Sequence, residues 1–194
     1  MKILNSSQIR ETDRQTIAYE PIASIELMER AAIACRDWII ERFTPAQSFS
    51  IICGSGNNGG DGLALFRLLT EKKYPCQLYV FPLEKQPSPD YRENLTKINL
   101  NQVGKLTPKT LSLISDNDII IDALLGSGLN RPAAGPLKKI IQILNGLYNK
   151  VISIDLPSGL FCEHNANNPA EGIVQADHTP VSYTHLTLPT NREV

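Results

Sequence analysis

The sequence has no run of apolar residues long enough to cross a lipid bilayer, although 42% of its 194 residues are hydrophobic. Its first residues, Met1-Lys2-Ile3-Leu4-Asn5, lack the apolar core of a secretory signal peptide. The formal net charge is only −1 at pH 7, so no overall positive field attracts nucleic acids or anionic membranes. We therefore expect neither a nucleic-acid nor a membrane partner.

The chain also lacks the cysteine spacings of metal sites. Its four cysteines form no C-x-x-C pair, and they stand at Cys35, Cys53, Cys76 and Cys162. Two of them, Cys35 and Cys53, fall on apolar positions, which favours buried and reduced thiols over disulfides. Reduced thiols suit a cytoplasmic protein.

A dense glycine turn is the main feature that the sequence does have. The apolar run Ser50–Cys53 leads into Gly54-Ser55-Gly56-Asn57-Asn58-Gly59-Gly60-Asp61-Gly62, and residues 63–69 then show helical spacing. This order predicts a strand, a tight loop and a helix. We expect the glycines to adopt positive φ angles and to let the backbone approach a ligand. The N–H groups that open the helix should favour an anion such as phosphate.

The glycine turn does not match the common nucleotide-binding families in full. Gly54, Gly56 and Gly59 fit G-x-G-x-x-G, but that pattern alone is also compatible with a plain tight turn. The turn has no Walker lysine, which argues against a P-loop kinase or ATPase. A Rossmann oxidoreductase needs an acid at the end of its second strand, and here that end reads Val80-Phe81-Pro82. An NAD-dependent oxidoreductase is therefore a disfavoured alternative.

Strands and helices alternate along the rest of the chain. We expect strands at residues 77–81, 118–122 and 151–155, and helices at about 88–98 and 136–144, while residues 100–115 are ambiguous. Two further helices, at about 6–17 and from Ser24 as its cap to 39, precede the first strand. The pattern predicts an α/β fold whose mostly parallel sheet is covered on both faces. The two extra N-terminal helices are absent from the standard dinucleotide fold.

Polar groups follow three of the expected strands. Asn57, Asn58 and Asp61 come after the first strand, Asp122 and residues 126–131 after a later one, and Asp155 and Ser158 after the last. Because the carboxyl ends of parallel strands share one edge of the sheet, we expect the three loops to converge on one crevice.

Each polar residue also has a purely structural interpretation. Asp61 is either a helix cap or a contact to an uncharged part of a ligand, and Arg131 either reaches a phosphate or is a solvated loop residue. Asp122 is either a strand end or a ligand of a hard, weakly charged cation. Ser158 can instead cap a turn. Asp155 is the strongest acid–base candidate, because burial at the end of an apolar strand raises a carboxyl pKa.

Taken together, these motifs resemble the NAD(P)HX epimerase family, the YjeF N-terminal domain. The matching stretches are Leu27-Met28-Glu29-Arg30-Ala31, the glycine turn, Asp122-Ala-Leu-Leu-Gly126-Ser-Gly128-Leu-Asn-Arg131-Pro132 and Asp155-Leu-Pro-Ser-Gly159. The resemblance implies a Rossmann-like three-layer αβα sandwich. It also implies an isomerase of nicotinamide cofactor repair, which interconverts the R and S epimers of hydrated NADH and NADPH so that a separate dehydratase can use the S form.

The resemblance also assigns roles by position. It implies a potassium ion held by Asn58, Asp122 and Ser158. The hydrated dinucleotide would be held by Asp155 and by two loops, which comprise Asn57, Asn58, Gly59, Gly60 and Asp61, and Gly126, Ser127, Gly128, Leu129, Asn130, Arg131 and Pro132. Inverting a ring carbon that bears a hydroxyl group needs proton transfer, which we assign to Asp155 first and Asp61 second. The intact polar residues favour the enzyme over a non-enzymatic nucleotide-binding or dimerisation scaffold of the same fold, such as the one in an mRNA-decapping enhancer.

The end of the chain departs from the family pattern. We expect residues 1–179 to form a YjeF N-terminal domain that is truncated at its C-terminus, and residues 180–194 to be a non-matching tail. In many bacterial relatives a kinase-like dehydratase domain follows, so a lost C-terminal domain is a candidate partner. Relatives dimerise through this domain, which implies a homodimer here.

Overall fold

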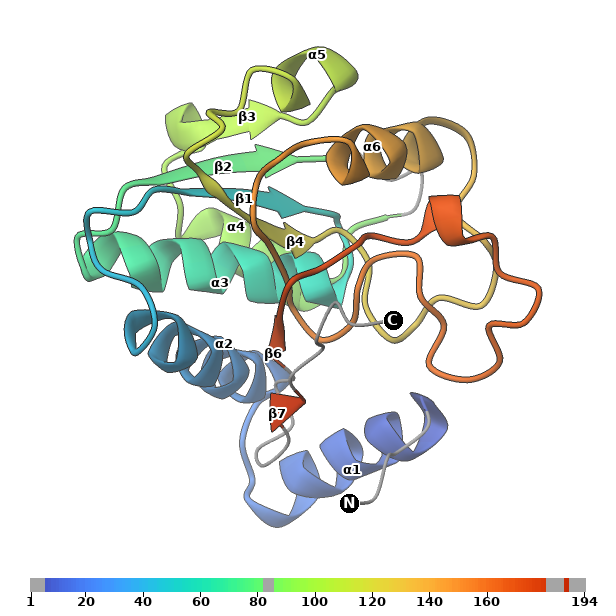
Figure 1. Ribbon diagram of the computed structural model, residues 1–194. Coiled ribbons are helices and arrows are strands. Elements are labelled where there is room, and N and C mark those ends of the chain that lie inside the picture. Colours follow the sequence, from blue (N-terminus) through green and yellow to red (C-terminus); the bar gives the residue numbers. More distant parts are fainter. Residues whose placement is uncertain (1–5, 82–85, 181–186, 189–194) are drawn as a thin grey trace.

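A five-stranded parallel sheet forms the centre of the computed structural model, which describes residues 6–81, 86–180 and 187–188 (Figure 1). The strand order is β3-β2-β1-β4-β5, and every neighbouring pair is parallel. The strands are β1 (Phe49–Cys53), β2 (Cys76–Val80), β3 (Val103–Lys105), β4 (Ile119–Ala123) and β5 (Val151–Ser153). The chain winds outward from β1 to β3 and then crosses to β4, so the direction of winding reverses between β1 and β4. In such sheets a ligand binds beyond the strand ends at that point.

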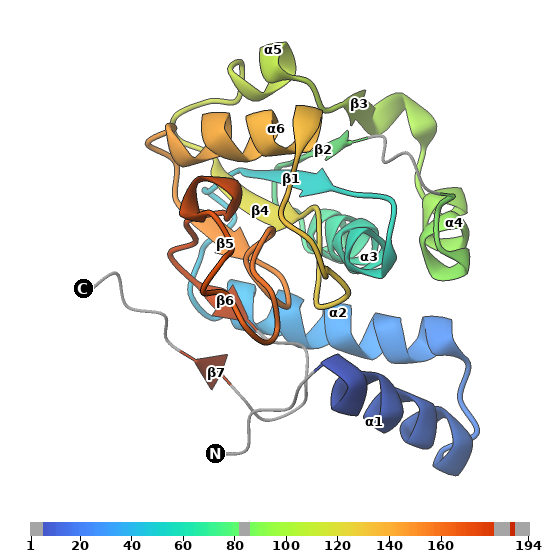
Figure 2. The ribbon, with the colours of Figure 1, turned by 90° about the vertical axis from the view of Figure 1, so that its right-hand side faces the viewer.

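Helices cover both faces of the sheet (Figures 1 and 2). The helix α3 packs against one face, α2 packs on α3, and α6 covers the other face. The helices are α1 (Ser6–Tyr19), α2 (Ser24–Ile40), α3 (Asn57–Glu71), α4 (Pro89–Thr96), α5 (Pro108–Leu111) and α6 (Gly135–Asn145), and two short 3-10 helices are η1 (Leu100–Gln102) and η2 (Ala170–Gly172). This confirms the predicted three-layer α/β fold with two additional helices before the first strand.

Two apolar cores explain why the strands read as continuous hydrophobic runs. Every residue of β1 and β4 is buried. Ile51 and Ile121 point into the core beneath α3, whereas Ile52 and Ile120 point into the core beneath α6. Successive strand residues face opposite sides, so a strand that is covered on both sides is apolar along most of its length and not at alternate positions only.

Some local expectations were wrong or incomplete. The cap of α2 is Ala23, whose N–H donates to Glu26 Oε2 at 2.7 Å, and Ser24 is the first helical residue. The Ser24 hydroxyl instead donates to Asp90 Oδ2 at 2.6 Å. The ambiguous stretch 100–115 contains η1, β3 and α5, each only three or four residues long. β5 ends at Ser153, two residues earlier than expected.

Beyond β5 the chain returns along the sheet. The backbone N–H of Ser153 donates to the carbonyl of His178 at 2.9 Å, and β6 (Thr179–Pro180) then pairs antiparallel with β7 (Thr187–Leu188). Apart from Pro180, Thr187 and Leu188, the predicted tail lies outside the described residues. Of the helices that the structure describes, none combines the length and the apolar character needed to span a membrane.

Candidate active site

The glycine turn lies between β1 and α3, as predicted, but its glycines serve close packing. None of the glycines from Gly54 to Gly62 has a positive φ angle, so the expectation of left-handed backbone was wrong. A Cβ atom on Gly59 would lie 1.9 Å from the carbonyl oxygen of Gly54, and one on Gly62 would lie 2.6 Å from Cys53 Sγ. Only glycine therefore lets the first turn of α3 lie directly against the end of β1. This contact fixes the position of Asn58 and Asp61 at the edge of the sheet.

Asp122, at the end of β4, connects the β4 and β5 loops. Its carboxylate is fully buried and accepts four hydrogen bonds. Oδ1 accepts from the Ser158 hydroxyl at 2.6 Å and the Leu124 N–H at 3.2 Å, while Oδ2 accepts from the Ser153 hydroxyl at 2.7 Å and the Ser158 N–H at 2.9 Å. Burial raises the pKa of Asp122, and the hydrogen bonds from Ser158 and Ser153 oppose that rise.

The carbonyl of Leu125 brings the first loop into the same cluster. It accepts a hydrogen bond from Asn58 Nδ2 at 2.7 Å and lies 3.2 Å from Ser158 Oγ. The N–H of Leu125 donates to Ser158 Oγ at 2.8 Å. The other end of the Asn58 amide, Oδ1, is buried and has no hydrogen-bond partner. Loops after β1, β4 and β5 thus meet at one point, as the sequence predicted.

Asp155 lies beside this cluster on strained backbone. Its φ angle is 67°, in the left-handed region that few residues other than glycine, asparagine and aspartate adopt. Its Oδ2 accepts the N–H of Ser127 at 2.9 Å. A Cβ atom on Gly126 would lie 3.0 Å from that oxygen and 3.0 Å from Asn58 Cβ, so the β4 loop fits closely between the two residues. Burial raises the pKa of Asp155, against the opposing hydrogen bonds from Ser127, which confirms the predicted direction.

Asp61 lies on α3, close enough to Asp155 for the charge of that residue to act on it. It is the fifth residue of the helix, whose N-cap is Gly56, so the interpretation as a helix cap was wrong. Burial raises its pKa well above the ordinary carboxyl value, and the negative charges of Asp155, Asp13 and Asp90 raise it further. The field of Asp155 therefore reaches Asp61, which places the two proposed proton-transfer groups in one electrostatic environment. Beside Asp61 is a narrow crevice, lined by Ala31, Ala32, Cys35, Asp61 and Ile154.

The remaining predicted binding residues lie at the rim. Within the first loop, Asn57 is exposed, whereas Gly59 and Gly60 are buried. Beyond Ser127 the β4 loop runs outward, so that Leu129 is half-buried and the exposed residues are Gly128, Asn130, Arg131 and Pro132. Among the described side chains, no three of His, Cys, Asp or Glu are grouped in a way that could hold a metal ion.

Sequence reasoning missed several contributors to the site. Ser153 was detectable, because a serine inside an otherwise apolar strand needs a buried partner, and its hydroxyl binds Asp122. The carbonyl of Leu125 was not detectable, because a backbone group leaves no side-chain pattern. Cys162, from the loop after β5, lies with its Sγ 3.6 Å from the carbonyl of Ser127. Asp13, on α1, raises the pKa of both Asp61 and Asp155.

The fold and the site define a doubly wound α/β protein whose polar residues gather where the winding direction reverses. The family described as YjeF-related protein N-terminus matches residues 24–187, and the chain belongs to this family. The NAD(P)H-hydrate epimerase of Limosilactobacillus fermentum is 32% identical over 191 residues, which cover 97% of this chain and 89% of that protein. The NAD(P)H-hydrate epimerase of Rhodobacter capsulatus is 36% identical over 166 residues, covering 81% and 77%.

Two further relatives differ in length or in sequence. The bifunctional NAD(P)H-hydrate repair enzyme Nnr of Thermofilum pendens is 30% identical over 194 residues, which cover 92% of this chain but 35% of that protein. The crystal structure of yeast ynu0, YNL200c, superposes with a TM-score of 0.72 at 22% identity, covering 92% of this chain and 79% of the yeast chain. This likeness supports the fold alone.

Proposed function

We propose that this protein is an NAD(P)H-hydrate epimerase, an isomerase that interconverts the R and S epimers of NADHX and NADPHX. The observation that supports it most is the position of Asp155, a half-buried residue on left-handed backbone beside the loops from β1 and β4. Strained backbone concentrates at functional sites, and an acid–base group needs a pKa shifted towards neutral pH. The curated relatives named above carry the same activity in their names.

Proton transfer by Asp155 accounts for the chemistry. In the hydrated cofactor, the carbon that bears the hydroxyl group is bonded to the ring nitrogen. When a protonated carboxyl donates to that hydroxyl, water leaves and the nitrogen lone pair stabilises the planar cation. Water then adds to the opposite face and returns a proton to the carboxylate. Asp155 supplies this group, and Asp61, whose pKa is also raised, is the second candidate.

The two loops would hold the rest of the dinucleotide. The first turn of α3 presents N–H groups next to the exposed Asn57, which suits a phosphate. Exposed Arg131 adds a positive charge at the rim of the β4 loop. In this proposal Asn57–Asp61 and Gly126–Pro132 bind the substrate, while Asp155 lies at the reacting carbon.

A potassium ion fits the cluster at Leu125. Asn58 Oδ1 is a buried acceptor without a donor, and Ser158 Oγ and the Asp122 carboxylate lie in the same network. Neutral oxygens and a single carboxylate suit a weakly charged, hard cation. When bound, the ion would supply positive charge that orders the three loops. Because Asp122 already accepts four hydrogen bonds, we infer that it contributes mainly its charge.

We place the protein in the cytoplasm together with an S-specific dehydratase that uses its product. None of the four cysteines, all within the described residues, forms a disulfide, which suits a reducing compartment. The bifunctional relative from Thermofilum pendens shows by its name that the repair activities also occur in one chain. A homodimer remains part of this proposal, by analogy with relatives.

The test couples the purified protein to an S-specific dehydratase and supplies the R form of NADHX. We expect NADH to return faster than spontaneous epimerisation allows. Asp155→Asn, which keeps the side-chain shape and tolerates left-handed backbone, should lose this acceleration but still bind the substrate. The matched control is Asp116→Asn, an equivalent change on an exposed loop, which should keep full activity. A folded wild-type protein that gives only the spontaneous rate would refute the proposed function.

A further inference from the structure

We propose that Asn94, on α4, is a positioning residue that holds the first turn of α3 in its substrate-binding place. The inference rests on the proposed function of that turn. Asn94 is 1% exposed and is separated by 34 residues from Gly60, which it contacts. No feature of the sequence connects it to the site, because its role depends on how α4 docks.

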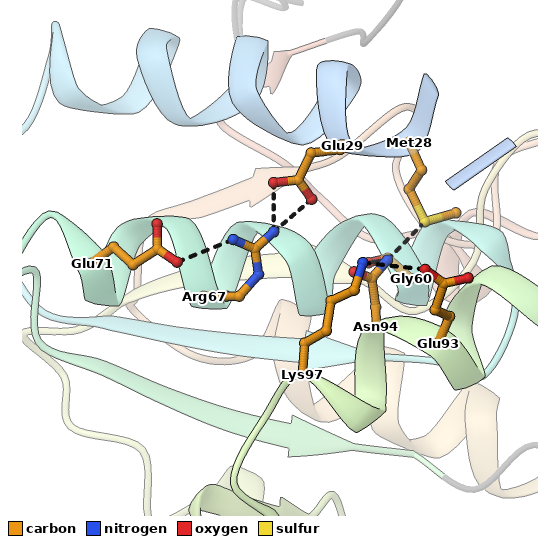
Figure 3. A network of polar contacts seen from close by, with 8 residues as sticks. All are labelled: Met28, Glu29, Gly60, Arg67, Glu71, Glu93, Asn94 and Lys97. Carbon is orange, nitrogen blue, oxygen red and sulfur yellow. Dashed lines mark hydrogen bonds and ion pairs between the residues drawn. The ribbon is translucent and has the colours of Figure 1, made fainter. Parts of the chain in front are cut away.

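The helix α4 holds the glycine turn at two points. At its N-terminus, the N–H of Ser88 donates to the carbonyl of Ser55 at 3.0 Å. Further along, Asn94 Nδ2 lies 3.4 Å from the carbonyl of Gly60 and 3.2 Å from Met28 Sδ (Figure 3). Gly60 lies between Asn58 and Asp61, so the second point is within the turn that carries both side chains.

Gly60 is also the place where three helices come together. A Cβ atom there would lie 2.8 Å from Met28 Sδ on α2 and 3.4 Å from the Cα of Tyr91 on α4. A displacement of this turn towards α2 or α4 is therefore opposed by packing, and a displacement away from α4 would break the contact of the Asn94 amide with the Gly60 carbonyl. The geometry explains how α4 can control the position of Asn58 and Asp61 through Gly60.

The three helices do not need Asn94 to stay together. Outside the contact at Gly60, the Ser24 hydroxyl on α2 donates to Asp90 on α4. On the α2–α3 side, Arg67 Nη2 lies 2.5 Å from both carboxylate oxygens of Glu29 (Figure 3). These interactions link α2 to its two neighbours independently of the Asn94 amide.

Stability gives a poor explanation for an asparagine at this position. Asn94 Oδ1 is buried and has no hydrogen-bond partner. A buried polar atom without a partner destabilises the folded state, whereas an apolar residue of similar size does not. If Asn94 served packing alone, leucine at this position would make the folded state more stable. If Asn94 serves to hold Gly60, leucine would remove that contact.

The experiment separates these two explanations with a matched pair, Asn94→Leu and Asn149→Leu. Asn149 is also buried, its Nδ2 donates to the carbonyls of Ser115 and Asp118 at 2.8 Å, and its Oδ1 likewise lacks a partner. Asn149 lies just before β5, at the amino-terminal ends of the strands, whereas the proposed site lies at their carboxyl ends. For Asn94→Leu we expect an unchanged or higher melting temperature and a KM for the R form of NADHX raised about fivefold, the equivalent of one hydrogen bond.

Amide hydrogen exchange supplies a readout that does not depend on activity. In Asn94→Leu the amides of residues 58–62 should exchange at least about fivefold faster, which again corresponds to the loss of one hydrogen bond. Asn149→Leu should change neither the exchange of these amides nor the KM. The alanine pair Asn94→Ala and Asn149→Ala replaces the leucine pair if either leucine variant does not fold. An unchanged KM and unchanged exchange in the folded Asn94 variant would overturn the inference. A wild-type protein without epimerase activity would refute the proposed function instead, and exchange would still decide the role of Asn94.

Discussion

Substituting alanine for Gly59 tests whether close contact between α3 and β1 positions the active site. The added Cβ would lie 1.9 Å from the carbonyl oxygen of Gly54, whereas real Cβ contacts essentially never fall below 3.0 Å. The first turn of α3 must therefore shift by about 1.1 Å, the difference between these distances. The obstacle is backbone at the end of a buried strand, so it cannot rotate away as a side chain can.

Two magnitudes follow from this shift. Overpacking of this kind destabilises a protein by about 3 kcal/mol. For a chain of this length that corresponds to a melting temperature about 6–12 °C lower. A misplacement of about 1 Å in a catalytic site lowers the rate about 100-fold, so kcat/KM for the R form of NADHX should fall by that factor in the folded fraction.

Gly56→Ala is the control for this substitution. Gly56 has a φ of −88°, and a Cβ atom added to it would have no neighbouring atom within 4 Å, so alanine fits there without a clash. We expect Gly56→Ala to lose at most about 1 kcal/mol of stability, which lowers the melting temperature by about 2–4 °C. Thermal denaturation and the coupled dehydratase assay measure both variants. A Gly59→Ala protein with wild-type stability and wild-type kcat/KM would show that the contact does not position the site.

Two further predictions concern the buried polar groups. Burial raises the pKa of Asp61 in the folded protein. The protonated carboxyl group therefore contributes its full stability below the unfolded pKa of about 3.9, and this contribution is lost as the pH rises through the higher folded pKa. Asp61→Asn should therefore melt at a higher temperature than the wild type at pH 7, by about 2–4 °C for each kcal/mol of stability gained. This difference should disappear near pH 4. An equal difference in melting temperature at both pH values would contradict the reasoning. Ser158→Ala removes the hydroxyl that donates to Asp122 and accepts from Leu125, so it should destabilise the protein by about 1–3 kcal/mol in urea denaturation. The same variant should need more KCl for half-maximal activity, and an unchanged KCl requirement would remove Ser158 from the proposed potassium site.

The sequence was sufficient for the architecture because apolar periodicity determines it. The run Ile119–Ile121 has no polar residue, and this identifies a strand that is covered on both faces. Once the sheet is parallel, the loops after β1, β4 and β5 must lie at one edge, which is why the convergence of Asn58, Asp122 and Asp155 could be predicted. Short pieces such as β3 and α5 could not, because three or four residues do not establish a period.

The details of the site depend on groups that leave no pattern in the sequence. The Leu125 carbonyl joins Asn58 to Ser158, yet any residue carries a carbonyl. The left-handed backbone of Asp155 depends on how the chain leaves β5, and the contact of Asn94 with Gly60 depends on the docking of α4. The function of the glycines was misjudged for a similar reason, since close approach and positive φ both select glycine.

The distribution of polarity along the sheet edge favours the proposed epimerase over a dinucleotide-dependent oxidoreductase. A dinucleotide-dependent oxidoreductase uses the end of its second strand to bind the ribose through an acidic residue. Here Val80 and Phe81, at the end of β2, pack against the two apolar cores. The carboxylates of Asp122 and Asp155 instead lie on the other side of β1. Asp122 is buried near the end of β4, and Asp155 is half-buried two residues after β5. In the proposed function, a ligand held from that side would meet the Asp155 carboxyl group at its reacting carbon, as inversion of a hydroxyl-bearing centre requires.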